Sequence, residues 1–126
     1  MNKDSSGVLS GRRLLLVEDE ALIAMELEDL INRLGAEVIG PYGRLADALE
    51  ALGHHRVDGA FLDAQLDGDM TFQIADLLLQ AGNPVLFVTG AAAGSIPQRY
   101  LGVPRLHKPF DYEELECMAK LIFAGD

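Results

Sequence analysis

The feature that most constrains the fold is an alternation of short apolar runs with segments of helical periodicity. Leu14 to Val17 is a continuous apolar run, as expected for a strand that is buried on both faces. The next segment has the apolar spacing of one helix face, outlined by Ile23, Leu27, Leu30, Ile31 and Leu34. Repeated strand–helix units predict an α/β fold in which a parallel sheet carries helices on both faces.

Similar patterns predict the remaining elements. Further strands are expected at residues 38–39, 57–62, 84–88 and 103–107, and helical stripes at residues 45–52, 74–81 and 115–122. Glycines are expected to close the first three helices, namely Gly35, Gly53 and Gly82. Asp111 is expected to cap the last helix. The segment from Ala91 to Gly102 holds two glycines and a proline, which predicts a short or irregular fourth helix.

Length and composition indicate a single globular domain. The chain has 126 residues, of which 49% are hydrophobic, and we expect a flexible lead at residues 1–10 and one domain over residues 11–126. The net charge of −10 argues against nucleic-acid binding, which needs an excess of Lys and Arg. No apolar run approaches the ~18 residues of a membrane span, so a cytoplasmic location is expected.

Chemically distinctive residues follow four of the predicted strands. They are Glu18, Asp19, Asp63, Thr89 and Lys108. Ligands of doubly wound sheets bind beyond the carboxyl ends of the strands, so these side chains are expected to meet at one edge. A lone Asp at a strand end is usually a turn residue, and an acidic cluster often only begins a helix. The joint occurrence at successive strand ends favours a functional site.

The residue types in this cluster indicate phosphoryl chemistry. Crowded carboxylates need a cation, and oxygen ligands with open positions suit Mg²⁺. A carboxylate beside Mg²⁺ and Lys108 can attack phosphorus, because both cations neutralise charge on the phosphoryl oxygens. The product is an aspartyl phosphate at Asp63, and the hydroxyl of Thr89 is expected to bind a phosphoryl oxygen.

These residues resemble the motifs of the receiver domain of two-component signalling. The segment 15–20 (Leu-Leu-Val-Glu-Asp-Glu) resembles the acidic motif after the first strand, and Phe61-Leu62-Asp63 resembles the phosphoacceptor strand. Thr89-Gly90 and Lys108-Pro109-Phe110 resemble the two later motifs. The resemblance implies a flavodoxin-like, doubly wound, five-stranded parallel sheet in the order 2-1-3-4-5, an order that the family's chemotaxis members illustrate.

The resemblance also implies a role for each site residue. Asp63 is the phosphoacceptor, and Lys108 and Thr89 contact the phosphoryl group. Mg²⁺ is held by Asp19, Asp63 and the backbone carbonyl of Gln65, and Glu18 acts through water. The implied phosphodonor is a histidine kinase or a phosphotransfer protein.

Two positions depart from the common pattern. A Met-Pro-x-x-x-Gly run is often found after the acceptor, where this chain has Gln65 to Asp69. The aromatic residue that swings inward on activation is replaced by Arg105, and Tyr100 is the nearest aromatic before it.

The segment 84–90 (Pro-Val-Leu-Phe-Val-Thr-Gly) resembles a subgroup, often of single-domain receivers, with a Phe-Ala-Thr-Gly motif.

The predicted function is that of a signalling switch, not of an enzyme with a separate substrate. Because the sequence ends just after the last helix, we expect no output domain, so that the output is a contact with an unknown protein or a phosphate sink. One alternative is a degenerate receiver that binds partners without phosphorylation. Another is an aspartyl-phosphate phosphohydrolase, against which Gln65 argues, because haloacid-type enzymes need an Asp there. A flavodoxin-like cofactor binder is a third, against which the acidic first loop argues.

Overall fold

The computed structural model describes residues 7–66, 68–90 and 96–124, and its centre is a five-stranded parallel sheet. The sheet has the order β2-β1-β3-β6-β7, which confirms the predicted 2-1-3-4-5 arrangement. The strands are β1 (Arg13–Val17), β2 (Glu37–Tyr42), β3 (Gly59–Leu62), β6 (Val85–Thr89) and β7 (Arg105–His107). The helices are α1 (Ala21–Arg33), α2 (Leu45–His54), α3 (Phe72–Gln80) and α4 (Tyr112–Phe123).

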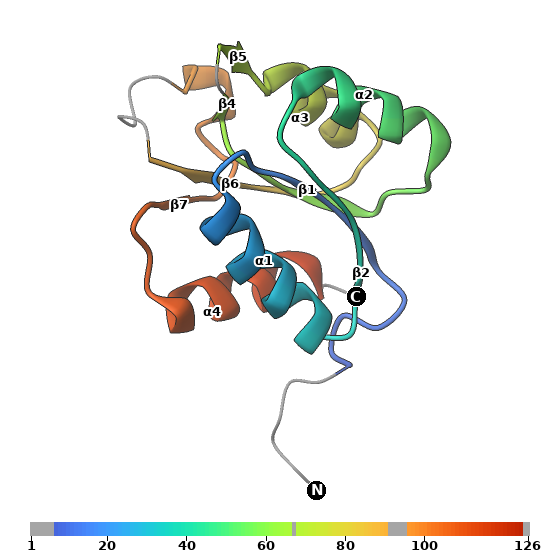
Figure 1. Ribbon diagram of the computed structural model, residues 1–126, viewed down its shortest axis with the longest axis vertical. Helices are drawn as coiled ribbons and strands as arrows, with labels where there is room; N and C mark the ends of the chain where they lie inside the picture. Colours follow the sequence, from blue (N-terminus) through green and yellow to red (C-terminus); the bar gives the residue numbers. More distant parts are fainter. Residues whose placement is uncertain (1–6, 67, 91–95, 125–126) are drawn as a thin grey trace, which may run out of the picture.

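The helices form two layers, with α1 and α4 on one face of the sheet and α2 and α3 on the other (Figure 1). Alternate residues of β1 point to the two layers. Leu15 and Val17 belong to the core under α2 and α3, whereas Leu14 and Leu16 belong to the core under α1 and α4. All four are fully buried, which explains why the strand reads as an unbroken apolar run.

Strand pairing brings the carboxyl ends of the strands to one edge. Val17 of β1 pairs with Leu62 of β3, Leu62 pairs with Phe87 of β6, and Thr89 pairs with His107 of β7. The residues directly after these strands are therefore neighbours in space, although they are far apart in the sequence. This register fixes the position of the predicted site.

The strand β2 is longer than the sequence predicts. It continues through Gly40-Pro41, where we expected it to end, and its register with β1 shifts between Leu15 and Val17. Proline is tolerated here because β2 is an edge strand. Gly40 has a φ of +118°, and a Cβ atom there would lie 2.7 Å from the carbonyl oxygen of Leu16. The close approach of the two strands thus requires glycine.

Helix ends are partly as predicted. Gly35 follows α1 with a φ of +94°, and the Asp111 side chain accepts a 3.0 Å hydrogen bond from the backbone N–H of Glu113 at the start of α4. Gly53 is different, since α2 runs through it to His54. None of the helices in the described ranges combines the length and the apolar character needed to cross a membrane.

Two segments outside the main elements need separate mention. The predicted lead at 1–10 lies outside the described residues up to position 6, but Leu9 is fully buried and its backbone N–H donates to the carbonyl of Leu34. The packed domain therefore begins earlier than position 11, because Leu9 fills the core under α1. Of the predicted irregular segment 91–102, residues 96–102 are described and hold a 3₁₀ turn at Gln98–Tyr100.

Candidate functional site

Asp63 lies directly after β3 and is held at both carboxylate oxygens. Its Oδ1 accepts a 3.1 Å hydrogen bond from the backbone N–H of Gln65, and its Oδ2 accepts a 3.0 Å bond from the Lys108 ammonium. Its own backbone N–H donates to the carbonyl of Val17, which extends the β1–β3 pairing by one residue. Asp63 is only 6% exposed. The carboxylate is therefore oriented before any ligand arrives.

Lys108 lies directly after β7 and contacts three carboxylates. Its Nζ donates hydrogen bonds to Glu18 Oε2 at 2.9 Å, to Asp63 Oδ2 at 3.0 Å and to Glu20 Oε1 at 2.5 Å. Burial alone would lower the pKa of Lys108, but the hydrogen bonds to Glu20, Glu18 and Asp63 outweigh it and raise the pKa above its ordinary value. The ammonium is thus charged under physiological conditions.

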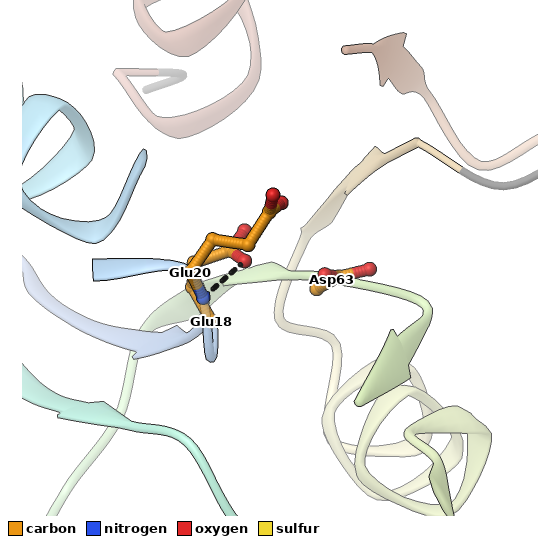
Figure 2. A group of neighbouring side chains, drawn as sticks. All are labelled: Glu18, Glu20 and Asp63. Carbon is orange, nitrogen blue, oxygen red and sulfur yellow. Dashed lines mark hydrogen bonds between the residues drawn. The ribbon is translucent and has the colours of Figure 1, made fainter. Parts of the chain in front are cut away.

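Glu18 and Glu20 bring the acidic end of β1 toward Asp63 (Figure 2). The backbone N–H of Glu20 donates a 3.0 Å hydrogen bond to Glu18 Oε2, drawn as the dashed line in Figure 2. Burial raises the pKa of Glu18 to about 7; the hydrogen bonds from Lys108 and Glu20 oppose this, and the nearby Asp63 charge adds to it. A further cation near Glu18 would stabilise the charged form of this carboxyl group.

The oxygen ligands fit a divalent cation. Carboxylate oxygens of Glu18, Glu20 and Asp63 lie within 4.8 Å of one another. The Oε1 atom of Glu18 is buried and accepts no hydrogen bond from any described residue, although the Lys108 ammonium lies 2.9 Å away in an ion pair. A cavity of about 520 Å³ is lined by Glu20 and Asp63, and also by Asp19 and Gln65. Carboxylates with open space for water are the setting that Mg²⁺ prefers.

The structure places each predicted site residue at the same edge of the sheet, but not all in contact. Glu18, Asp63 and Lys108 touch directly, whereas Asp19 and Gln65 line the adjoining cavity. Thr89 ends β6 and is fully buried, and its backbone carbonyl accepts a 2.9 Å hydrogen bond from the N–H of Lys108. The direct role of Asp19 as a metal ligand remains a prediction.

Comparison with known proteins decides the family. Residues 14–120 match the response regulator receiver domain. The chain belongs to this family. It is a receiver of the two-component type, as the sequence motifs predict.

Several relatives of this receiver are known. It is 37% identical over 107 residues to the sensory transduction protein LytT of Bacillus cereus. The aligned region covers 82% of this chain and 44% of LytT. It is 37% identical over 91 residues to the phyllosphere-induced regulator PhyR of Methylorubrum extorquens, covering 70% of this chain and 32% of PhyR. The chain therefore spans less than half the length of these two relatives.

Solved structures support the same assignment. The solution structure of SdrG from Sphingomonas melonis Fr1 superposes with a TM-score of 0.75 at 33% identity, covering 88% of this chain and 97% of SdrG. Because nearly all of SdrG is matched, a receiver can make up almost the whole of a related solved chain. The chain therefore shares its overall fold with SdrG.

Sequence reasoning assigned no role to two residues that form hydrogen bonds with Lys108 or Asp63. Glu20 is the third partner of Lys108, and the hydroxyl of Thr71 donates a 2.7 Å hydrogen bond to the backbone carbonyl of Asp63. The polar loop after Asp63 is a small hairpin, in which β4 (Gln65–Leu66) pairs with β5 (Asp69–Met70). The Asp67-Gly68 pair in the sequence is a turn signal that could have revealed the hairpin.

At the motif position where many receivers have an aromatic residue, this chain has Arg105, which contacts the backbone of Tyr100. The Arg105 guanidinium donates a 2.9 Å hydrogen bond to the backbone carbonyl of Tyr100. The Tyr100 ring is 2% exposed and stacks on Phe72 at 5.2 Å, and its hydroxyl donates to Asp76 of α3. The Tyr100 side chain therefore packs the segment after β6 against α3, although Tyr100 is not at the usual motif position.

Proposed function

We propose that this receiver accepts a phosphoryl group on Asp63 in a Mg²⁺-dependent reaction and acts as a signalling switch. The observation that carries the proposal is the position of Asp63, buried at a cavity edge between Lys108 and carboxylates that fit a divalent cation. A carboxylate in this setting is oriented for nucleophilic attack, and the cations around it offset the phosphoryl charge.

Besides Mg²⁺, the transfer needs only groups of this chain and the donor. An Asp63 carboxylate oxygen forms a bond to phosphorus, and the phosphorus–nitrogen bond of a donor phosphohistidine breaks. The electron pair of that bond stays on the imidazole nitrogen, which takes up a proton from solvent water. Lys108 holds the carboxylate before transfer, and we assign it to a phosphoryl oxygen afterwards, with Thr89 as a second donor. No separate substrate is turned over, so we do not class the protein as an enzyme.

We assign Mg²⁺ to Asp19, Asp63 and the backbone carbonyl of Gln65, with Glu18 acting through water. Bound there, the ion neutralises charge on the transferring phosphoryl group. The fit is supported by the oxygen-lined cavity and by the buried Glu18 Oε1 that accepts no hydrogen bond from the described residues.

We further propose a histidine kinase or phosphotransfer protein as the donor and an unidentified protein as the output partner. A cytoplasmic location follows from this donor chemistry, since ATP charges the phosphohistidine there. The net charge of −10 supports the absence of a nucleic-acid partner.

Intact-protein mass spectrometry after incubation with Mg²⁺ and acetyl phosphate tests the proposal. We expect one added phosphoryl group in the wild type, none in Asp63→Asn, and normal labelling in Asp47→Asn, which removes an exposed carboxylate of α2. Beryllofluoride is a second probe, since SdrG, 32% identical with a TM-score of 0.69, has a structure in a BeF₃-activated conformation. The proposal would be refuted if the wild type showed no labelling by acetyl phosphate and no amide shifts with beryllofluoride.

Labelling with acetyl phosphate and an assay of phosphate release from a phosphomonoester separate the alternatives. A degenerate receiver would take up no phosphoryl group, and a phosphohydrolase would release phosphate continuously from phosphomonoesters. We favour neither, because Asp63 and Lys108 are in direct contact at the cavity and Gln65 occupies the position of a second catalytic Asp.

A further inference from the structure

The Lys108 ammonium has all three of its hydrogen-bond donors engaged. An ammonium group carries three N–H bonds, and they go to Glu18, Asp63 and Glu20. A phosphoryl oxygen can therefore gain a hydrogen bond from Lys108 only if one of these three contacts is given up.

The three contacts differ in how easily they can be lost. The side chains of Glu18 and Asp63 are 0% and 8% exposed, whereas that of Glu20 is 60% exposed. A buried carboxylate that loses its cation is left without water, but an exposed one is solvated at once. The Glu20 contact is thus the one that costs least to break.

The position of Glu20 in the chain points the same way. Glu20 occupies the N-cap of α1, yet its side chain makes no capping hydrogen bond to that helix. The side chain instead lies beside Glu18 at the phosphoacceptor pocket (Figure 2), and its carboxylate accepts a hydrogen bond from Lys108. Glutamate is not among the residues that commonly cap a helix, so the contact that this side chain makes is the one across the site, with Lys108.

We propose that Glu20 is a positioning residue that occupies, in the resting state, the place on Lys108 that the phosphoryl group takes after transfer. Glu20 competes with the phosphoryl group for the ammonium and so sets how readily the activated state forms. This inference rests on the proposed function, because it assumes that Asp63 accepts the phosphoryl group.

The test compares Glu20→Gln with the matched variant Glu26→Gln, which removes the same charge from an exposed position of α1. Beryllofluoride is titrated at saturating Mg²⁺, with amide shifts as the readout. An exposed ion pair is worth a small factor, so we expect about twofold to fivefold tighter binding for Glu20→Gln. Glu20→Ala, which leaves no acceptor, should give at least the same gain, and Glu26→Gln should match the wild type.

A second readout reports on Lys108 itself. The NMR signal of the Lys108 Nζ ammonium is recorded without beryllofluoride, and we expect it to move in both Glu20 variants and not in Glu26→Gln. A purely local effect of Glu20 on α1 would leave this signal in place.

Three results would overturn the inference. The first is a wild-type response to beryllofluoride that Glu20→Gln leaves unchanged. The second is tighter binding with an unmoved Lys108 signal, which would reflect the general field of the charge. If the wild type does not respond to beryllofluoride or acetyl phosphate at all, the proposed function fails and the inference fails with it.

Discussion

The hydroxyl of Thr71 donates a hydrogen bond of 2.7 Å to the backbone carbonyl of Asp63. Thr71 is fully buried, and its own carbonyl accepts the first hydrogen bonds of α3, from the N–H groups of Ile74 and Ala75. One residue therefore joins the start of a helix to the backbone of the proposed phosphoacceptor.

We predict that Thr71→Val lowers the free energy of unfolding by about 1–3 kcal/mol, because a buried carbonyl loses its donor while the side-chain shape is kept. Thr71→Ser, which retains the hydroxyl, should lose less. Urea denaturation measures both, and labelling with acetyl phosphate should be slower in the valine variant. Equal stability of the two variants would contradict this role for the hydroxyl.

Substitution of Lys108 should destabilise the protein in a way that Mg²⁺ reverses. Lys108→Met leaves the buried Glu18 and Asp63 without their shared ammonium, so we predict a loss of about 3 kcal/mol in EDTA. Saturating MgCl₂ should recover most of it, since a ligand that binds only the folded state stabilises that state.

The control for Lys108 is Lys120→Met on α4. Lys120 forms a partly exposed ion pair of 3.4 Å with Glu116, so its loss should cost less than about 0.5 kcal/mol, with or without Mg²⁺. A similar loss in both variants would show that Lys108 contributes only as a surface charge.

We predict that the Tyr100 hydroxyl makes the free energy of unfolding depend on pH in the alkaline range. Burial, and then the hydrogen bond to Asp76, raise the pKa of Tyr100 above its ordinary value of about 10. The unfolded chain therefore loses this proton first as the pH rises. The contribution to stability is complete below pH ~10 and is lost above it, as the pH passes through the pKa of the folded state.

Tyr100→Phe should remove this part of the pH dependence, while Tyr42→Phe should leave it in place. The measurement is the free energy of unfolding between pH ~8 and ~11 for each variant. If Tyr100→Phe declines as steeply as the wild type above pH ~10, the phenol does not titrate as the structure indicates.

We predict that alanine substitutions at two glycines change the stability of the protein in opposite directions. A Cβ atom at Gly59 of β3 would lie 2.8 Å from the Phe123 ring, so Gly59→Ala should cost about 1–3 kcal/mol. At Gly53, inside α2, a Cβ atom meets nothing within 4 Å, so Gly53→Ala should stabilise the protein by about 0.5–1 kcal/mol. Thermal unfolding of the pair checks both signs.

Most of the fold could be predicted because its elements depend on local patterns. Strand residues covered on both faces are uniformly apolar, as at positions 14–17 of β1, and a helix with one buried face shows it in its spacing, as in α1. The exact ends were harder. Pro41 looks like a strand end in sequence, but a proline on an edge strand loses no internal hydrogen bond, so β2 continues.

The proposed site was predicted in its main residues because each follows a strand end, and parallel strands end at one edge. The contacts of Glu20 and Thr71 were not predictable in this way. Each depends on where a side chain points across an interface, from Glu20 to Lys108 and from Thr71 to Asp63. Their residue types are ordinary at a helix start, so the sequence carries no distinguishing signal.

The starts of two helices on opposite faces of the sheet are both connected to Asp63, one through its backbone carbonyl and one through Lys108. Glu20 immediately precedes α1, and Thr71 immediately precedes α3. A change of charge at Asp63 is therefore felt at the base of both helical layers together. A phosphoryl group on Asp63 would therefore add its negative charge next to the first turns of helices from both layers.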